Sequence, residues 1–232
     1  MNEQNILPYR DKHKGQKAIL FCTGPSLEKY DYRPLLTAET TRPIMVGVNG
    51  IIFAEVAREV GLDYLFLQDT GRVNGAKHKH VFHQNIDEFA KFKCREQKFY
   101  GTFIHGDLIA PTKKEAQHSG AKQYEMIRPK CLARFPLVDD IGHFTLGGGC
   151  SVAFSALQFI LFTGVSKVQV VGCDGTSNGY AGIESGEGIA YDRILSMWKM
   201  IPSFLQEYYP DIKLEIVRPV ALRGIGLNTS SE

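Results

Sequence analysis

Two turns of the sequence combine glycine with a hydroxyl side chain directly before a predicted helix. The first turn follows a continuous apolar run, and the second contains three consecutive glycines. Glycine lets the chain bend sharply and lets a ligand approach the backbone, and the free backbone N–H groups at a helix start favour anions. We therefore predict that seven residues of these turns bind a nucleotide or its phosphate: Gly24, Pro25, Ser26, Leu27, Gly148, Gly149 and Ser151.

Each turn also has a purely structural interpretation, which the sequence leaves open. The turn around Gly24 suits an ordinary connection from a strand to a helix, with Pro25 at the first helical position. The glycines before Ser151 suit a hinge or the close packing of a helix on a sheet, with Ser151 as the helix cap. Neither turn has the G-x-G-x-x-G spacing of the dinucleotide-binding fingerprint.

Polar side chains that directly follow apolar runs are the other candidates. Asn49 and Asp69 come after two successive runs, and we predict that they orient the nucleotide or the sugar. Asp174 follows a later run and is predicted to act in catalysis, together with Tyr191 and Asp192 beyond a glycine-rich stretch. The alternative for Asp69 and Asp174 is that each caps the turn that follows it.

Three other kinds of chemistry find no support in the sequence. The histidines between residues 78 and 83 lie beside basic residues, which disfavour a cation, so no metal site is predicted. The G-x-S-x-G pattern of serine hydrolases is absent. The stretch from Gly71 to Lys77 lacks the spacing of a P-loop.

The apolar runs predict the framework that must position these residues. Continuous apolar runs that end at turns are typical of strands buried on both faces, as in parallel sheets. Five strands are predicted, at residues 18–22, 43–48, 64–67, 168–171 and 213–217. Three helices are predicted, at residues 51–60, 151–162 and 190–208. We expect Pro202 to kink or divide the last helix.

The alternation of strand, turn and helix predicts the fold class. It is α/β, with a Rossmann-like, mainly parallel sheet and helices on both faces. Residues 17–232 are predicted to form a single nucleotide-binding domain, and residues 1–16 an N-terminal extension. The polar section between residues 71 and 134 is expected to hold short helices and a strand or two. The glycine-rich stretch at residues 176–190 is expected to close over the ligand as a lid.

Composition narrows the classes of function. The 232 residues carry a net charge of +2, whereas a nucleic-acid surface needs a basic excess. The five cysteines form no C-x-x-C pair and their number is odd, which is typical of reduced thiols, so we expect a cytoplasmic protein. The longest apolar stretch, residues 152–165, is shorter than the ~20 residues of a spanning helix, so no membrane segment is expected.

Two stretches of the sequence resemble a known superfamily. Residues 19–32 hold an apolar strand and a Gly-Pro-Ser-Leu turn, and residues 148–174 hold a Gly-Gly turn, a helix, a strand and a Gly-x-Asp ending. Together they resemble the small bacterial sialyltransferases, which use a cytidine-monophosphate sugar. They also resemble the motility accessory factors and hydroxymethylpterin pyrophosphokinase-like proteins, grouped as family of unknown function 115. The resemblance covers residues 17–70 and 145–175.

The resemblance implies a nucleotide-binding transferase, most directly a glycosyltransferase for surface glycan synthesis. Its substrate would be a nucleotide sugar, which is CMP-linked in the sialyltransferases, and its acceptor would be a glycan or a small molecule. Assembly into a homo-oligomer is an open alternative. Two alternatives are a pterin-type pyrophosphokinase, which needs ATP and Mg²⁺, and a non-catalytic ligand-binding relative. The sequence departs from the sialyltransferases because their base is a histidine after the Gly-x-Asp strand, and this chain has no histidine after His143.

Overall fold

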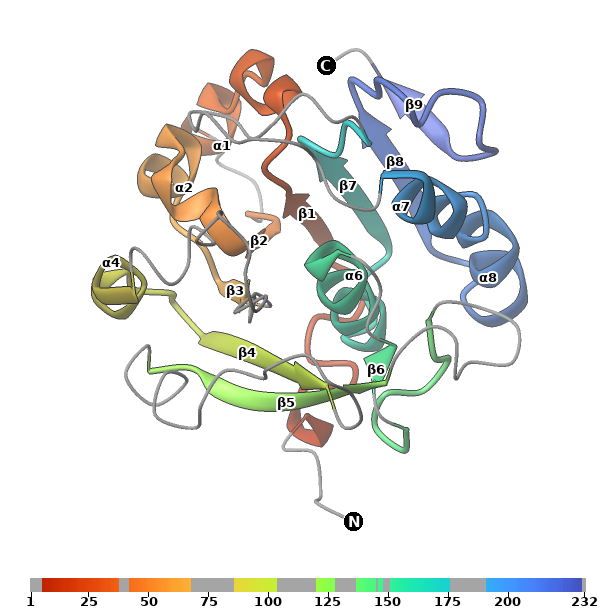
Figure 1. Cartoon of the computed structure of the whole chain (residues 1–232), viewed down its shortest axis with the longest axis horizontal. Coiled ribbons are helices and arrows are strands. Elements are labelled where there is room, and N and C mark those ends of the chain that lie inside the picture. Colours follow the sequence, from red (N-terminus) through yellow and green to blue (C-terminus); the bar gives the residue numbers. More distant parts are fainter. Residues whose placement is uncertain are drawn as a thin grey trace, which may run out of the picture.

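A single parallel sheet organises the chain, as the predicted fold class requires (Figure 1). The structure is a computed structural model, and it describes residues 6–37, 42–67, 86–103, 120–127, 137–144, 146–147, 151–175 and 191–230. Nine strands lie within these residues: β1 (Lys17–Phe21), β2 (Ile44–Val48), β3 (Tyr64–Leu67), β4 (Gln97–Phe103), β5 (Lys122–Ile127), β6 (Leu146–Gly147), β7 (Lys167–Val171), β8 (Lys213–Val217) and β9 (Asn228–Ser230). All neighbouring pairs among them are parallel.

The strand order reverses at β1. The order across the sheet is β6-β5-β4-β3-β2-β1-β7-β8-β9, so the chain builds one half outward from β1 and the other half outward from β7. In open parallel sheets, ligands bind outside the carboxyl ends of the strands at such a reversal. The five predicted strands are all present, and β1 and β7 flank the reversal.

Helices cover both faces of the sheet. Their bounds are η1 (Leu7–Tyr9), η2 (Pro25–Lys29), α1 (Arg33–Thr37), η3 (Asn49–Phe53), α2 (Glu55–Val60), α4 (Ile86–Lys91), α6 (Val152–Phe162), α7 (Tyr191–Trp198) and α8 (Ile201–Tyr208), where η marks a 3₁₀ helix. Alternate residues of β1 face opposite sides. Leu20 lies in the cluster formed with α6, α7 and α8, and Phe21 lies in the cluster formed with η3, α2 and α4.

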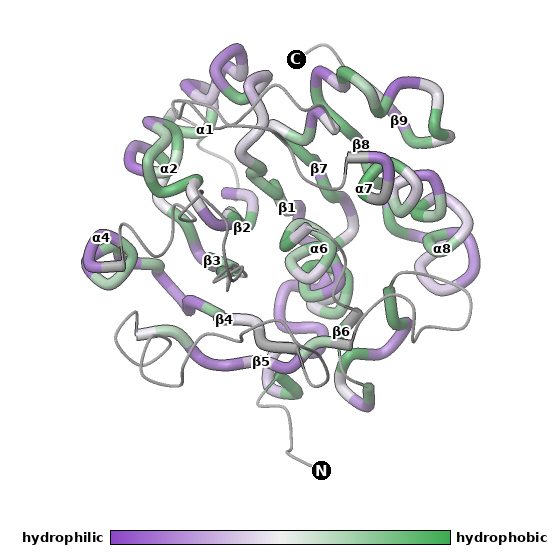
Figure 2. The backbone as a smooth tube through the Cα atoms, in the orientation of Figure 1, coloured by the Kyte–Doolittle hydropathy of each residue, from purple (hydrophilic) through white to green (hydrophobic). Residues whose placement is uncertain are grey.

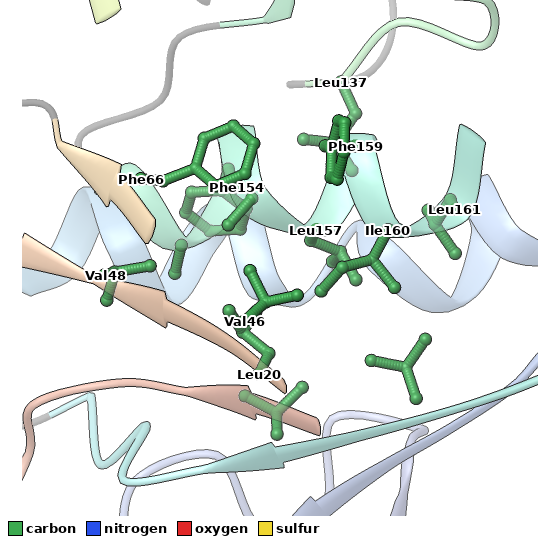
Figure 3. Close-up of a cluster of buried hydrophobic side chains, with 14 of the residues drawn as sticks. Leu20, Val46, Val48, Phe66, Leu137, Phe154, Leu157, Phe159, Ile160 and Leu161 are labelled. Carbon is green, nitrogen blue, oxygen red and sulfur yellow. The ribbon is translucent and has the colours of Figure 1, made fainter. Parts of the chain in front are cut away.

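Helix α6 is the centre of the larger hydrophobic cluster. All eleven of its residues are buried, because the helix is apolar on every side and lies between the sheet and other elements. Phe159 packs against Phe66 of β3 (Figure 3). Phe154 packs against Trp198 of α7. Figure 2 shows hydrophobic residues concentrated along α6 and the central strands. Of the helices that the described residues form, none has the length and apolar character needed to cross a membrane.

Two of the predicted helices are divided. The helix predicted at residues 51–60 is a 3₁₀ turn followed by α2, because Ala54 adopts an extended conformation between them. Gly61 then ends α2 with a positive φ of 65°. The helix predicted at residues 190–208 breaks into α7 and α8, with Pro202 in the first turn of α8, where its missing N–H costs nothing.

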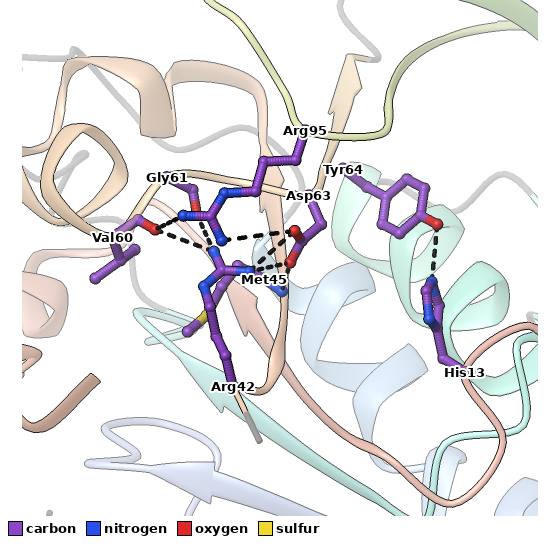
Figure 4. Close-up of polar contacts among 8 residues, drawn as sticks. All are labelled: His13, Arg42, Met45, Val60, Gly61, Asp63, Tyr64 and Arg95. Carbon is purple, nitrogen blue, oxygen red and sulfur yellow. Dashed lines mark hydrogen bonds and ion pairs between the residues drawn. The ribbon is translucent and has the colours of Figure 1, made fainter. Parts of the chain in front are cut away.

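The N-terminal segment before β1 packs into the larger cluster. Ile6 and Tyr9 are buried there, and Tyr9 makes edge contacts with Tyr64 and Phe159. His13 Nε2 lies 2.8 Å from the hydroxyl of Tyr64, which starts β3 (Figure 4). The described part of the segment predicted as an extension is therefore attached to the sheet.

A buried carboxylate joins the amino ends of β2 and β3. Asp63 accepts from Arg42 Nη1 at 2.9 and 2.7 Å and from the backbone N–H of Met45 at 2.7 Å (Figure 4). The second amino group of Arg42 donates to the carbonyls of Val60 and Gly61, where α2 ends. Charge-assisted bonds of this kind fix the connection between α2 and β3.

Candidate functional site

The carboxyl ends of β1 and β7 meet in one hydrogen-bonded junction. The backbone N–H of Gly24 donates to the carbonyl of Gly172 at 2.7 Å. The backbone N–H of Ser26 donates to Oδ2 of Asp174 at 2.8 Å. Asp174 therefore caps the start of η2 from a position 148 residues later in the chain. This junction occupies the point where the strand order reverses, where a ligand is expected.

Gly24 is a glycine because of this junction. A Cβ atom at Gly24 would lie 2.6 Å from the carbonyl oxygen of Gly172 and 2.8 Å from Oδ2 of Asp174, closer than real contacts allow. The φ of Gly24 is −70°, which any residue can adopt. Glycine is therefore required at position 24 because Gly172 and Asp174 of the same protein come so close to it.

The backbone amides of this turn are engaged within the protein, so a phosphate held by Gly24, Ser26 and Leu27 stays a prediction. Pro25 has no N–H, and the N–H groups of Gly24 and Ser26 donate to Gly172 and Asp174. The N–H of Leu27 donates to the carbonyl of Gly24 at 3.0 Å, and its side chain is buried in the cluster with α2. The helix start is already occupied by a carboxylate, which also repels a phosphate.

Two polar atoms at the junction remain unsatisfied within the described residues. Oδ1 of Asp174 and Oγ of Ser26 are both buried, and neither has a hydrogen-bond partner among those residues. Asp174 is 5 % exposed and Ser26 is 9 % exposed. Buried polar atoms without a partner cost folding free energy, so a ligand that bonds to both would recover it. The carboxylate oxygen accepts, and the hydroxyl both accepts and donates.

Two thiols lie under this junction. Cys22 follows β1, Cys173 precedes Asp174, and both are buried and free. Gly172, between β7 and Cys173, has a φ of 70°, so the extended conformation of β7 ends before Cys173. A hydrogen bond with Cys22, followed by burial, raises the pKa of the Cys173 thiol well above its ordinary value. A nucleophilic thiolate at Cys173 is therefore disfavoured.

The second predicted turn lies at the same edge of the sheet. Gly147 ends β6, which is parallel to β5, and α6 begins at Val152. Ser151 is the N-cap of α6, and its Oγ accepts from the backbone N–H of Ala153 at 3.3 Å. The structural role of Ser151 as a cap is confirmed. Gly148 and Gly149 lie outside the described residues.

Of the other predicted site residues, the structure describes Asn49 and Asp192. Asn49 directly follows β2 at the same edge and has a φ of 41°. Asp192 lies in the first turn of α7 with its side chain exposed. Asp69, the side chain of Tyr191 and the predicted lid at residues 176–190 lie outside the described residues.

Sequence reasoning missed the segment after β8. The backbone N–H of Ala221 donates to the carbonyl of Asp174 at 2.9 Å, so this segment lies directly against the candidate site. The available signal was a strand followed directly by the charged residue Arg218, the same kind of strand ending that identified Asp174.

Comparisons with known proteins place the fold. No protein-family model matches the sequence, and no curated protein matches it. The structure is similar to the MAf glycosyltransferase from Magnetospirillum magneticum AMB-1, with a TM-score of 0.53 and 12 % identity over 99 % of this chain. It is also similar to the sialyltransferase CST-II in complex with a trisaccharide acceptor and CMP, with a TM-score of 0.51 and 15 % identity.

The two similarities differ in coverage. The chain spans 38 % of the MAf glycosyltransferase, whereas it matches CST-II over 87 % of its own length and 80 % of that chain. At these identities the likeness shows a shared α/β fold with a parallel sheet. It agrees with the fold that the sequence resemblance implied.

Proposed function

We propose that the chain is a nucleotide-binding transferase that uses a nucleotide-activated sugar, a glycosyltransferase in reaction class. Support comes from the fold shared with two glycosyl-transferring proteins and from a polar junction at the reversal of strand order. The proposed ligand is a nucleotide sugar, with a glycan or a small molecule as acceptor. CST-II was solved with CMP and a trisaccharide, which makes a cytidine nucleotide the first ligand to test.

The unsatisfied pair of Asp174 and Ser26 carries this proposal. The two side chains offer a carboxylate oxygen and a hydroxyl at the junction that follows the adjacent strands β1 and β7. Such a pair suits a neutral group that donates hydrogen bonds, such as a ribose or sugar hydroxyl or the amino group of a base. In this proposal Asp174 binds the ligand through Oδ1 while Ser26 keeps the carboxylate in place through its backbone N–H.

In such a transfer the nucleotide phosphate is the leaving group. The reaction depends more on stabilising the charge of this phosphate than on a covalent nucleophile. The proposed arrangement therefore separates two tasks. Asp174 and Ser26 fix the position of the nucleotide, and other groups must compensate the phosphate charge. Tyr191 and Asp192 stay predictions for the catalytic step.

The test is a thermal-shift panel of cytidine, uridine, guanosine and adenosine nucleotides, with ATP measured both with and without Mg²⁺. A ligand that binds the folded state raises the melting temperature by mass action. We expect a rise with at least one nucleotide, and the loss of that rise in Asp174→Asn. The asparagine retains an oxygen for the Ser26 N–H but presents an amino group where Oδ1 was.

Asp211→Asn is the matched control for loss of one carboxylate charge, because Asp211 is exposed and lies before β8, at the opposite edge of the sheet from the junction. If binding depends on Asp174, the control keeps nucleotide affinity. A rise with ATP only when Mg²⁺ is present would favour the pyrophosphokinase alternative. No rise with any nucleotide would overturn the proposed function.

A further inference from the structure

The carboxyl end of β8 lies beside the candidate site. Strands β1, β7 and β8 are consecutive in the sheet, and Val170 of β7 pairs with Ile216 of β8. That pair is the last of the register, and Gly172 and Arg218 each follow directly after the end of their strand, at the same edge of the sheet. Gly172 is the residue that accepts from Gly24, so the arginine follows a strand adjacent to the junction.

The segment that begins at Arg218 packs against Asp174. The backbone N–H of Ala221 donates to the carbonyl of Asp174 at 2.9 Å. A Cβ atom at Gly175 would lie 3.3 Å from the side chain of Leu222, so the two loops are in close contact. Arg218 and the candidate ligand-binding carboxylate therefore belong to two adjoining loops at one edge of the sheet.

Arg218 is held in an unusual backbone conformation. Its φ is 50°, in the left-handed region that residues with a Cβ atom seldom adopt. Its N–H donates to the carbonyl of Ser230 in β9 at 2.7 Å, which maintains that conformation. The side chain is exposed, and within the described part of the chain no hydrogen bond or ion pair engages its guanidinium group.

We propose that Arg218 binds the anionic group of the ligand, the phosphate in the case of a nucleotide. This inference rests on the proposed function, since it concerns the same site. The amides of the turn around Gly24 are already engaged, and Asp174 repels an anion. A nucleotide whose hydroxyl or amino group meets Asp174 therefore needs a cation nearby for its phosphate, and a guanidinium group matches phosphate geometry with two parallel hydrogen bonds.

Arg223 provides a matched control on the same loop. It is also exposed, but its Nε donates to the carbonyl of Pro219 at 2.9 Å, which directs the guanidinium toward its own loop. Arg223→Gln removes the same charge as Arg218→Gln from nearly the same place. A difference between the two variants therefore reports a specific contact and not the general field of the loop.

The experiment compares nucleosides with their monophosphates by titration calorimetry on the wild-type chain, Arg218→Gln, Arg218→Lys and Arg223→Gln. We expect Arg218→Gln to weaken monophosphate binding by about 10- to 100-fold, as is typical for the loss of a hydrogen bond between charged groups. Nucleoside binding should change by less than about 2-fold, because the nucleoside has no phosphate. Arg218→Lys should restore part of the affinity, and Arg223→Gln should resemble the wild type.

The outcomes separate the two proposals. Wild-type protein that binds neither nucleosides nor monophosphates contradicts the proposed function and this inference with it. Wild-type binding that Asp174→Asn weakens but Arg218→Gln does not would overturn the role of Arg218 alone. Equal losses of nucleoside and monophosphate binding in Arg218→Gln, with a lowered melting temperature, would show that Arg218 only shapes the loop and would also overturn the inference.

Discussion

The backbone N–H of Ser26 donates a 2.8 Å hydrogen bond to the carboxylate of Asp174 across the junction of β1 and β7. This bond links the first strand of the sheet to the strand that begins its other half. It satisfies Oδ2 of Asp174 and leaves Oδ1, together with Oγ of Ser26, without a partner among the described residues. A junction that is half satisfied in this way is stable enough to form and still has bonding capacity for a ligand.

Ser26→Ala should distinguish a ligand contact from a structural one. The hydroxyl makes no hydrogen bond with any described residue, so its removal should leave the free energy of unfolding of the ligand-free protein unchanged or slightly higher. Nucleotide affinity should fall. Urea denaturation and nucleotide titration measure the two quantities.

Ser151→Ala is the control for that substitution. Ser151 caps α6 through its Oγ, so its loss should destabilise the protein by about 0.5–2 kcal/mol. A comparable loss of stability in Ser26→Ala would mean that its hydroxyl has a partner within the protein, and the ligand-binding interpretation would then lose its basis.

Gly24→Ala should disrupt the junction by steric conflict. The added methyl group would approach a backbone carbonyl at 2.6 Å, and backbone cannot move aside as a flexible side chain can. We expect a loss of about 1–3 kcal/mol in the free energy of unfolding, typical of overpacking in a well-packed region. If Gly24→Ala has the stability of the wild type in urea denaturation, Gly172 and Asp174 do not approach Gly24 as closely as described.

Stability should decrease as the pH falls below the ordinary pKa of histidine, because of His13. Burial, and then the positive charge of Lys12, lower the pKa of His13 below 6.5, while Glu96 and Asp63 oppose the shift less strongly. The unfolded chain therefore binds this proton at a higher pH than the folded chain does. The stabilisation is present above about pH 6.5 and is lost as the pH falls toward the lowered pKa.

His13→Gln isolates this contribution. Glutamine keeps a polar group for the hydroxyl of Tyr64 but does not titrate. Between about pH 7.5 and pH 5, the free energy of unfolding should fall more steeply in the wild type than in the variant. Parallel pH profiles would contradict the assignment, whatever the other histidines contribute.

Asp63→Asn should destabilise the connection between α2 and β3. The substitution leaves Arg42 facing a neutral amide at a site where Asp63 is only 6 % exposed. We expect a loss of about 2 kcal/mol, since the arginine side chain retains some access to water. Asp31→Asn is the control, because the pair of Asp31 and Arg33 is exposed and should contribute nothing measurable. Equal effects in chemical denaturation would contradict this account.

The sequence predicted the framework well because its signals are local. The apolar runs of β1, β2 and β3 are continuous, β7 and β8 are short runs interrupted by one polar residue, and all five end at turns, which is typical of strands in a parallel sheet. Breaks within helices were harder to predict. Ala54 carries no breaker signal, yet its extended conformation separates η3 from α2.

The site was only half predictable, because its decisive contact is not local. Pro25 and Ser26 identified a helix start, but nothing near them in the sequence showed that its amides are occupied. The carboxylate that occupies them comes from Asp174, and Gly172 brings it there with a positive φ. The pairing of β1 with β7 creates this contact, and strand order cannot be read from a single strand and its turn.

The most direct test of the central claim is titration of the wild-type chain and of Asp174→Asn with cytidine, uridine, guanosine and adenosine monophosphates. The account predicts that the wild type binds at least one of them and that Asp174→Asn binds it at least about tenfold more weakly. The melting temperature of the variant should stay within a few degrees of the wild-type value, which shows that the variant is folded. Equal affinity of the two proteins, or no binding by the wild type, would contradict the claim that Asp174 and Ser26 form a nucleotide site.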